Sequence, residues 1–309
     1  MIKRTLYFGN PAYLSMNLDH LEHRIPAVEK NSGIPVGMKE DAVTRIPIED
    51  IGLVILDHKQ ITITHGLCEK LLENNASVLW CDKSHHPKGL LLPLSDNATQ
   101  SEKLKYQFEA SEPLKKQLWR QTVEQKIKNQ ASVLTHFGKD AQALEYLSRE
   151  VKSGDTSNIE GRAAAIYWQR LLEEFETTRG RYEQPPNHML NYGYAILRAI
   201  IARSLVGSGC LPVLGIHHRN KYNHYCLADD IMEPFRPFVD KLVLEYIYEN
   251  EFLPSDLGLN EKRYLLGLPV LDVSIDEKSS PLMVAAQRTT SSLMKCFMGE
   301  CRKILYPVL

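Results

Sequence analysis

The hydrophobic and polar positions of the chain follow two different spacings, one in the N-terminal third and another in the rest. Within residues 4–25 and 44–67, apolar residues occur in short blocks or alternate with polar ones, which is typical of buried and half-buried β-strands. The block Gly52–Leu56 is fully apolar and indicates a buried strand. A helix is expected over His65–Glu73 and another buried strand over 77–82, so the pattern predicts a small β-rich domain.

The pattern changes at residues 91–103, where Pro93 is followed by a polar, turn-forming cluster. Beyond it, apolar positions recur at helical spacing, which predicts a second domain made of α-helices. Helices are expected over 104–134 with an interruption at Pro113, and over 140–152, 158–177, 188–206, 228–250 and 281–305, with a loop at 182–189. The sequence thus predicts an α+β protein with a β-rich N-terminal domain, residues 1–97, and a larger all-α domain, residues 98–309.

Composition and charge narrow the class of protein without indicating an activity. The 309 residues are 43% apolar, enough for a sizeable core, and 24% charged, with 37 basic against 38 acidic side chains. This balance is that of an ordered globular protein and lacks the strong basic excess of a protein that coats nucleic acid. Any DNA-binding surface must therefore be a local patch.

Cysteine usage and the first residues predict a cytoplasmic protein. Six cysteines are scattered without a C-x-x-C pair, and the start MIKRTLYFGN lacks the apolar stretch of a secretory signal. Both features favour a reducing compartment and free thiols. Apolar runs such as 51–56 and 195–206 are too short or too charged to span a bilayer, so no membrane segment is expected.

The densest group of reactive side chains lies in His217–Arg236, HHRNKYNHYCLADDIMEPFR. Asp230 and Glu233 are three residues apart and share one face of a helix, while Glu160 begins another helical run that can meet the same histidines in space. A histidine with two or three carboxylates suits Mg²⁺ or Mn²⁺ better than a closed zinc site. Such a centre activates an oxygen nucleophile and neutralises phosphate charge, which points to phosphodiester substrates.

A purely structural role for Glu160 is the simpler alternative. The helix dipole favours a carboxylate in the first turn, and Ser157 or Asn158 can cap this helix. Gly161 adds weight to a functional role for Glu160. Glycine costs about 1 kcal/mol inside a helix, but it allows a ligand or another backbone to approach closely.

Adjacent histidines on an extended or loop segment point in different directions, so at most one of His217 and His218 is expected to be a ligand. The spacing from His218 to His224 resembles half of a zinc finger, but no cysteine pair lies upstream at the required distance, which argues against such a site. Basic residues cluster at positions typical of solvated helix faces, namely Lys115, Lys116 and Arg120, Lys126 and Lys128, Arg179 and Arg181, and Arg219 and Lys221. The last pair flanks the candidate ligands, where a phosphate needs positive partners.

Several segments of the chain closely resemble the CRISPR-associated integrase of spacer acquisition, the first Cas protein. They are QKIKNQASVL (125–134), NIEGRAAAIYW (158–168), LNYGYAILRAIIARSL (190–205) and GIHHRNKYNHYCLADDIMEPFRPFVD (215–240), and the similarity extends to RTLYFGNPAYLS near the N-terminus. The NPAYL and ADDIMEPFRP motifs look like the branch that accompanies type II systems.

The resemblance implies a metal site in the α-helical domain, with Glu160, His218 and Glu233 as metal ligands and catalytic residues and with Mg²⁺ or Mn²⁺ as the cofactor. The histidine is assigned by counting fifteen residues back from Glu233, and Asp230 matches an auxiliary acidic position. Further residues in matching motifs are expected to position DNA or brace the ligands: Asn191, Tyr192, Tyr194 and Arg236.

The implied function is antiviral defence through CRISPR adaptation. A metal-dependent DNA integrase and endonuclease would join the 3′-hydroxyl ends of captured double-stranded DNA to the CRISPR repeat by transesterification, and would hydrolyse phosphodiesters at the same site. The implied partners are a second copy of the chain, paired through the N-terminal domain, and the small second Cas protein, whose dimer bridges two such homodimers. The type II effector and accessory proteins are further expected partners.

Two other classes of function are kept open. A catalytically silent scaffold would bind DNA and the partner proteins without turnover. A zinc hydrolase acting on small molecules would hold zinc tightly and have no affinity for DNA.

Overall fold

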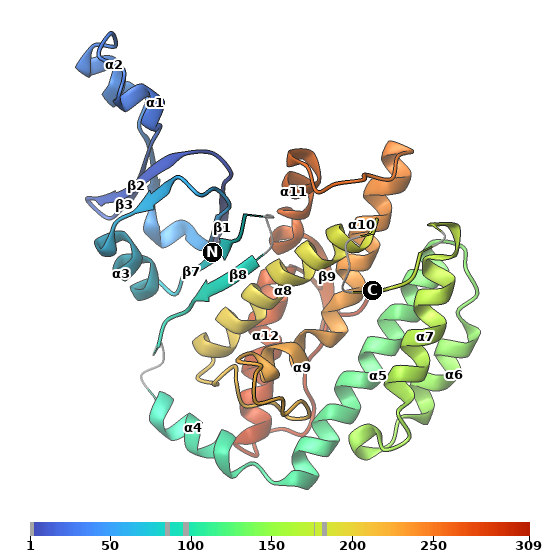
Figure 1. The fold of residues 1–309 in the computed structure, drawn as a ribbon. Coiled ribbons are helices and arrows are strands. Elements are labelled where there is room, and N and C mark those ends of the chain that lie inside the picture. Colours follow the sequence, from blue (N-terminus) through green and yellow to red (C-terminus); the bar gives the residue numbers. More distant parts are fainter. Residues whose placement is uncertain (1–2, 84–86, 95–98, 176, 181–183) are drawn as a thin grey trace. The chain divides into compact units, whose positions relative to one another are not determined.

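The computed structural model describes residues 3–83, 87–94, 99–175, 177–180 and 184–309. They belong to two compact units, Met1–Asp96 and Asn97–Leu309 (Figure 1). The boundary predicted between residues 97 and 98 falls outside the described residues, as does the beginning of the predicted loop at 182–189. Among the helices of the described ranges, none is both long and apolar enough to cross a membrane.

The described residues of the N-terminal unit form two four-stranded sheets and three short α-helices (Figure 1). In order across the sheets, the strands are β1 (Arg4–Phe8), β5 (Ile51–Leu56), β7 (Ser77–Cys81) and β8 (Pro87–Leu91) in one, and β4 (Thr44–Pro47), β3 (His20–Arg24), β2 (Ala12–Asn17) and β6 (Ile61–Ile63) in the other. The helices are α1 (Pro26–Glu29), α2 (Val36–Asp41) and α3 (His65–Glu73). The predicted β-rich character of this region is confirmed.

Strand β5 is buried at every position because it lies inside its sheet, parallel to β1 on one side and to β7 on the other. A strand covered on both faces has a continuous apolar sequence instead of an alternating one. Helix α3 begins where the Thr64 side chain accepts a hydrogen bond from the backbone N–H of Leu67, and its Leu67 and Leu71 enter the core with Val54.

The C-terminal unit is organised around α8 (Asn187–Gly207), a helix buried on nearly all sides. Helices α9, α10, α11 and α12 pack against α8, and α5 packs against α6, α7 and α10 (Figure 1). Their bounds are α4 (Gln100–Glu109), α5 (Glu112–His136), α6 (Gln142–Glu150), α7 (Ile159–Leu171), α9 (Cys226–Met232), α10 (Arg236–Asn250), α11 (Leu259–Leu265) and α12 (Leu282–Phe297). The helical C-terminal region predicted from the sequence is therefore present.

The helix predicted over 228–250 is broken into α9, a 3₁₀ turn at Glu233–Phe235 (η4) and α10. The break coincides with Pro234 and Pro237, which lie in the first turns of η4 and α10, where the missing N–H of proline is tolerated. Glu233 thus sits at a junction between two helices instead of on the face of one.

The prediction of an all-α C-terminal domain is wrong in one detail. Strands β9 (Asp272–Ile275) and β10 (Lys278–Pro281) form an antiparallel hairpin ahead of α12. Asp276 and Glu277, the two residues between the strands, both have positive φ, 54° and 59°, as a tight hairpin turn requires. Because neither is glycine or asparagine, the sequence lacks the usual signal for this turn.

The packing of α8 against α10 depends on the absence of a side chain at Gly193. A Cβ atom there would lie 2.5 Å from Val239 Cγ1, a stiff β-branched neighbour. We expect Gly193→Ala to lower the free energy of unfolding by about 1–3 kcal/mol through overpacking, measured by urea denaturation. Gly37→Ala in α2 is the matched control, since nothing lies within 4 Å of its added Cβ; equal stability of both variants would contradict this account.

Candidate active site

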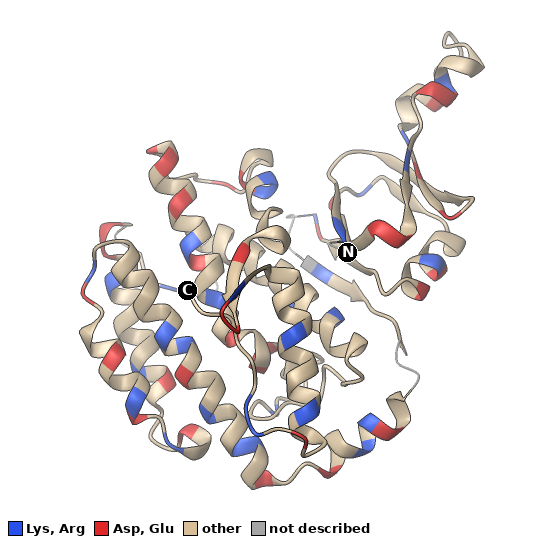
Figure 2. Cartoon of the chain, turned by 180° about the vertical axis from the view of Figure 1, so that it is seen from behind, with Lys and Arg blue, Asp and Glu red and all other residues tan. Residues whose placement is uncertain are grey.

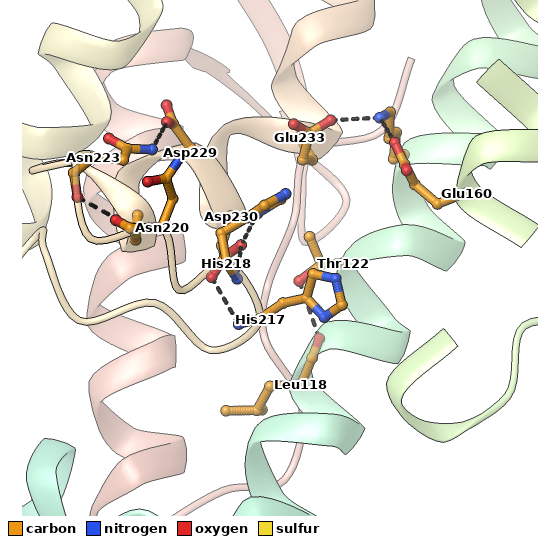
Figure 3. Close-up of polar contacts among 12 residues, drawn as sticks. Leu118, Thr122, Glu160, His217, His218, Asn220, Asn223, Asp229, Asp230 and Glu233 are labelled. Carbon is orange, nitrogen blue, oxygen red and sulfur yellow. Dashed lines mark hydrogen bonds and ion pairs between the residues drawn. The ribbon is translucent and has the colours of Figure 1, made fainter. Parts of the chain in front are cut away.

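Three elements of the C-terminal unit bring the candidate carboxylates together. Glu160 lies in the first turn of α7, Glu233 at the junction of α9 and α10, and Lys126 on α5. Figure 3 shows Glu160 and Glu233 extending toward each other. Lys126 Nζ lies 2.5 Å from Glu233 Oε2 and donates a hydrogen bond to Glu160 Oε1. Two carboxylates 73 positions apart in the chain therefore share one ammonium group.

Asp155 places Glu160 by capping α7. Its Oδ1 accepts a hydrogen bond from the Ile159 N–H at 2.8 Å and its Oδ2 accepts one from the Glu160 N–H at 3.0 Å. The prediction that the side chain of Ser157 or Asn158 caps this helix is therefore wrong. Asn158 occupies the N-cap position, but its backbone is in the left-handed conformation, with φ of 49°, and its side chain makes no capping hydrogen bond. Fixing the Glu160 backbone fixes the direction in which its carboxylate leaves the helix.

Gly161 accommodates a neighbouring side chain. An added Cβ would lie 2.8 Å from both Asn158 Oδ1 and Nδ2. Among the protein groups, the one that approaches this glycine closely is the Asn158 amide, in the turn that precedes α7.

The Glu233 carboxylate is nearly buried, with 9% of its side chain exposed, and has two cationic neighbours. Arg236 Nε donates a hydrogen bond to Oε1 at 2.9 Å, while Lys126 is ion-paired with Oε2 without an aligned hydrogen bond. Burial alone would raise the pKa of Glu233, but the charges of Arg236 and Lys126 outweigh it and lower the pKa to about 2. Glu233 is therefore ionised throughout the physiological pH range.

Lys126 is a buried cation on a helix face that the sequence suggested was solvated. Only 8% of its side chain is exposed, whereas Lys128 is exposed and pairs with Glu124. Burial lowers the pKa of Lys126, but Glu233 and Glu160 raise it by more, so the net shift is upward. The sequence signal was a lysine in register with the buried positions of α5, such as Val123.

His218 is oriented by a buried aspartate. The fully buried Asp230 accepts a hydrogen bond from His218 Nδ1 at 2.5 Å, and it also accepts from the backbone N–H groups of His217 at 2.9 Å and His218 at 3.3 Å (Figure 3). The hydrogen bond to Asp230 raises the pKa of His218, against the opposing effect of burial. With Nδ1 engaged, Nε2 is the nitrogen left for a ligand.

His217 has a different environment from its neighbour. Its ring stacks on the Trp119 indole, with ring centroids 4.2 Å apart and planes inclined by 2°, and it is nearly perpendicular to the His218 ring, at 85°. Burial, followed by the neighbouring His218, lowers the pKa of His217. The two histidines therefore point in different directions, as predicted, and His217 has the character of a packing residue.

The remaining predicted site residues lie beside this array. Arg236 joins Glu233 to the Tyr194 ring, whose centroid lies 4.7 Å from the guanidinium carbon. Asn191 accepts a hydrogen bond from Arg179, and that guanidinium also lies over Tyr194. Tyr192 is fully buried in α8. These positions fit bracing roles.

The donor types present fit a hard divalent cation. Two carboxylates and an imidazole are the O and N ligands that Mg²⁺ and Mn²⁺ accept, and the buried Glu233 Oε2 has no aligned hydrogen bond. Within the described ranges, no three His, Cys, Asp or Glu side chains stand close enough to hold a metal ion as they are. The positive charge between Glu160 and Glu233 is supplied by Lys126.

Comparison with known proteins decides the family. The profile described as CRISPR associated protein Cas1 matches residues 28–269, more than half of the chain. The chain belongs to the Cas1 family. It is 41% identical over 249 residues to the CRISPR-associated endonuclease Cas1 of Neisseria meningitidis serogroup C (strain 8013), which covers 80% of this chain and 81% of that relative.

Solved structures share the fold of this Cas1-family chain. One is a casposase bound to integration product, with a TM-score of 0.77 and 19% identity over 98% of this chain and 92% of the other. Another, in a Cas6-RT-Cas1–Cas2 complex, has a TM-score of 0.73 and 19% identity over 98% of this chain and 36% of a longer one. At these identities the likeness concerns the fold alone.

Gly215 allows Asp230 to reach the histidine backbone in this Cas1-family site. A Cβ there would lie 2.4 Å from the His218 carbonyl oxygen and 2.8 Å from Asp230 Oδ2. We expect Gly215→Ala to separate His218 from Asp230 and to lower the His218 pKa toward its ordinary value, measured by NMR titration of the imidazole. Gly37→Ala should leave that pKa unchanged. A folded Gly215→Ala protein with the wild-type His218 pKa would refute the role of this glycine.

Asp240 makes the stability of the helical unit dependent on pH. It is buried and accepts hydrogen bonds from Tyr167 and Tyr194, and burial raises its pKa to about 6 despite these bonds. A raised native pKa favours the protonated form, so stability is greatest below the unfolded pKa near 4 and falls as pH rises to 6.

We expect Asp240→Asn to remove this dependence. Relative to the variant, the wild type should lose roughly 3 kcal/mol of unfolding free energy between pH 4 and pH 7. Urea denaturation of both proteins across this range measures the difference. Parallel pH profiles would mean that Asp240 titrates normally.

Proposed function

We propose that this Cas1-family protein is a divalent-metal-dependent DNA integrase and endonuclease of CRISPR adaptation, in the branch that accompanies type II systems. The observation that carries the proposal is the convergence of Glu160 and Glu233 on one buried positive charge, with His218 held by a buried carboxylate. A cation shared by two carboxylates also occurs at the surface of this protein, where Lys70 pairs with Asp19 and Glu73, but those side chains are largely solvated. Here two share a cation in the interior.

Glu160, Glu233 and His218 Nε2 are the residues that would hold Mg²⁺ or Mn²⁺. When bound, such an ion supplies Lewis acidity to a phosphoryl oxygen and a lowered pKa to an oxygen nucleophile. Asp230 fixes the tautomer and direction of His218, as a carboxylate commonly does behind a metal-binding histidine. Arg236 keeps Glu233 ionised and held in place.

A cavity of about 390 Å³ adjoins His218 and offers positive charge for a phosphate backbone. Its lining contains Lys115, Arg219 and Lys221 together with Glu112, which is ion-paired with Arg219, so the basic residues outnumber the acidic one. Elsewhere on the C-terminal unit, basic and acidic residues are interspersed, as Figure 2 shows. This fits a protein whose DNA contacts are local patches, which a nearly neutral chain requires.

The proposed substrates are the 3′-hydroxyl ends of captured double-stranded DNA and the CRISPR repeat. The proposed assembly is a homodimer formed through the N-terminal unit, two of which are bridged by a dimer of the small second Cas protein, with the type II effector and accessory proteins as further partners. Two chains of the same fold were solved in settings that match this proposal, one in a Cas6-RT-Cas1–Cas2 complex and the other as a casposase bound to integration product.

The test is strand transfer by ligand variants. We expect Glu160→Ala and His218→Ala each to lower manganese-dependent joining of a 3′-hydroxyl DNA end to repeat DNA by roughly 100-fold or more, because the metal contributes several kcal/mol to the transition state. Glu124→Ala and His136→Ala, which change the same residue types outside the proposed ligand set and outside this cavity, are the controls and should retain activity.

Three outcomes would reject the proposal. Full activity of folded Glu160→Ala and His218→Ala would exclude these ligands. Wild-type protein that assembles with DNA and the second Cas protein but joins and cleaves nothing with Mn²⁺ would instead indicate a scaffold. Tightly bound zinc together with no affinity for DNA would point to a small-molecule hydrolase.

A further inference from the structure

The positive charge between Glu160 and Glu233 belongs to the protein itself. Lys126 Nζ is ion-paired with both carboxylates, and Glu233 and Glu160 are 9% and 30% exposed. Charges buried in a low-dielectric interior are costly unless they are paired. The lysine therefore stabilises the carboxylate pair when no metal is bound, and in return the carboxylates keep the lysine charged.

A divalent ion bound by these carboxylates would need the same oxygen atoms. Oxygen ligands lie about 2.0–2.1 Å from Mg²⁺, and the Glu160 Oε1 and Glu233 Oε2 atoms are those that Lys126 contacts. Two cations at one such position repel each other strongly. Glu233 Oε1, in contrast, is bonded to Arg236, so Glu233 retains one cationic partner when Lys126 withdraws.

We propose that Lys126 is the resident counter-ion of this carboxylate pair and that a divalent cation binds by displacing its ammonium group. The inference rests on the proposed metal-dependent function. Lys126 is then a positioning residue: it holds Glu160 and Glu233 toward each other before loading, and it weakens the apparent metal affinity because loading breaks two ion pairs.

The experiment measures metal binding and stability independently of catalysis. Lys126→Met and Lys126→Gln remove the charge while keeping most of the side-chain volume. Lys128→Met is the matched control, since Lys128 lies on the same helix, is exposed, and pairs with Glu124 at 2.8 Å. Free Mn²⁺ is titrated by its solution EPR signal, and the thermal midpoint is recorded in EDTA and at increasing Mn²⁺.

We expect both neutral Lys126 variants to bind Mn²⁺ about tenfold or more tightly than the wild type, because breaking a buried ion pair costs more than the energy of a tenfold change. In EDTA their thermal midpoints should fall below that of Lys128→Met. Mn²⁺ should raise their midpoints by more than it raises the midpoint of the wild type. A residue that only stabilised the fold would lower the midpoint without tightening Mn²⁺ binding.

Unchanged or weaker Mn²⁺ binding by the folded Lys126 variants would overturn the proposal. If a variant is unfolded in EDTA, folding on addition of Mn²⁺ supports it and failure to fold with Mn²⁺ overturns it. The proposed function is tested separately. If the wild type binds Mn²⁺, Glu160→Ala loses this binding and Lys126→Met does not tighten it, only the counter-ion role of Lys126 is rejected. Absence of any binding by the wild type defeats the metal site itself.

Discussion

The candidate site depends on the burial of one positive charge, the ammonium group of Lys126. It ties α5 to the start of α7 through Glu160 and to the junction of α9 and α10 through Glu233. A buried charge with one missing partner is strongly destabilising, so the relative positions of these three elements are coupled to the pairing. Because the three charges stabilise one another, a change in any of them alters the whole array.

The helix break at Glu233 matters because it lets two cations reach the carboxylate from different directions. A continuous helix through 228–250 would have kept Glu233 in regular register, whereas the 3₁₀ turn with Pro234 ends α9 and starts α10 at Arg236. Arg236 then bonds Glu233 with its Nε and lies over Tyr194, which donates a hydrogen bond to Asp240. The carboxylate is thus braced by the central helix α8 from one side and supplied with a cation by α5 from the other.

Sequence reasoning works where local pattern and tertiary environment agree. The α3 helix has its predicted bounds, His65–Glu73, because Thr64 supplies a local cap and the apolar residues face one core. The hairpin before α12 was missed because Asp276 and Glu277 take up left-handed conformations that their residue types do not signal. The sequence places Lys126 on a solvated helix face, since its burial depends on carboxylates 34 and 107 positions away in the chain.

The carboxylate of Asp230 and those of Glu160 and Glu233 differ in how firmly their partners are held. The oxygens of Asp230 accept from two backbone N–H groups and the His218 ring, in a space that only a glycine at position 215 leaves open. The two backbone donors belong to the loop itself and cannot leave unless the loop changes its conformation. The ammonium group of Lys126, in contrast, lies at the end of a flexible side chain and can move away from the two glutamates. This difference supports our proposal that the two glutamates bind the cation while Asp230 holds the histidine.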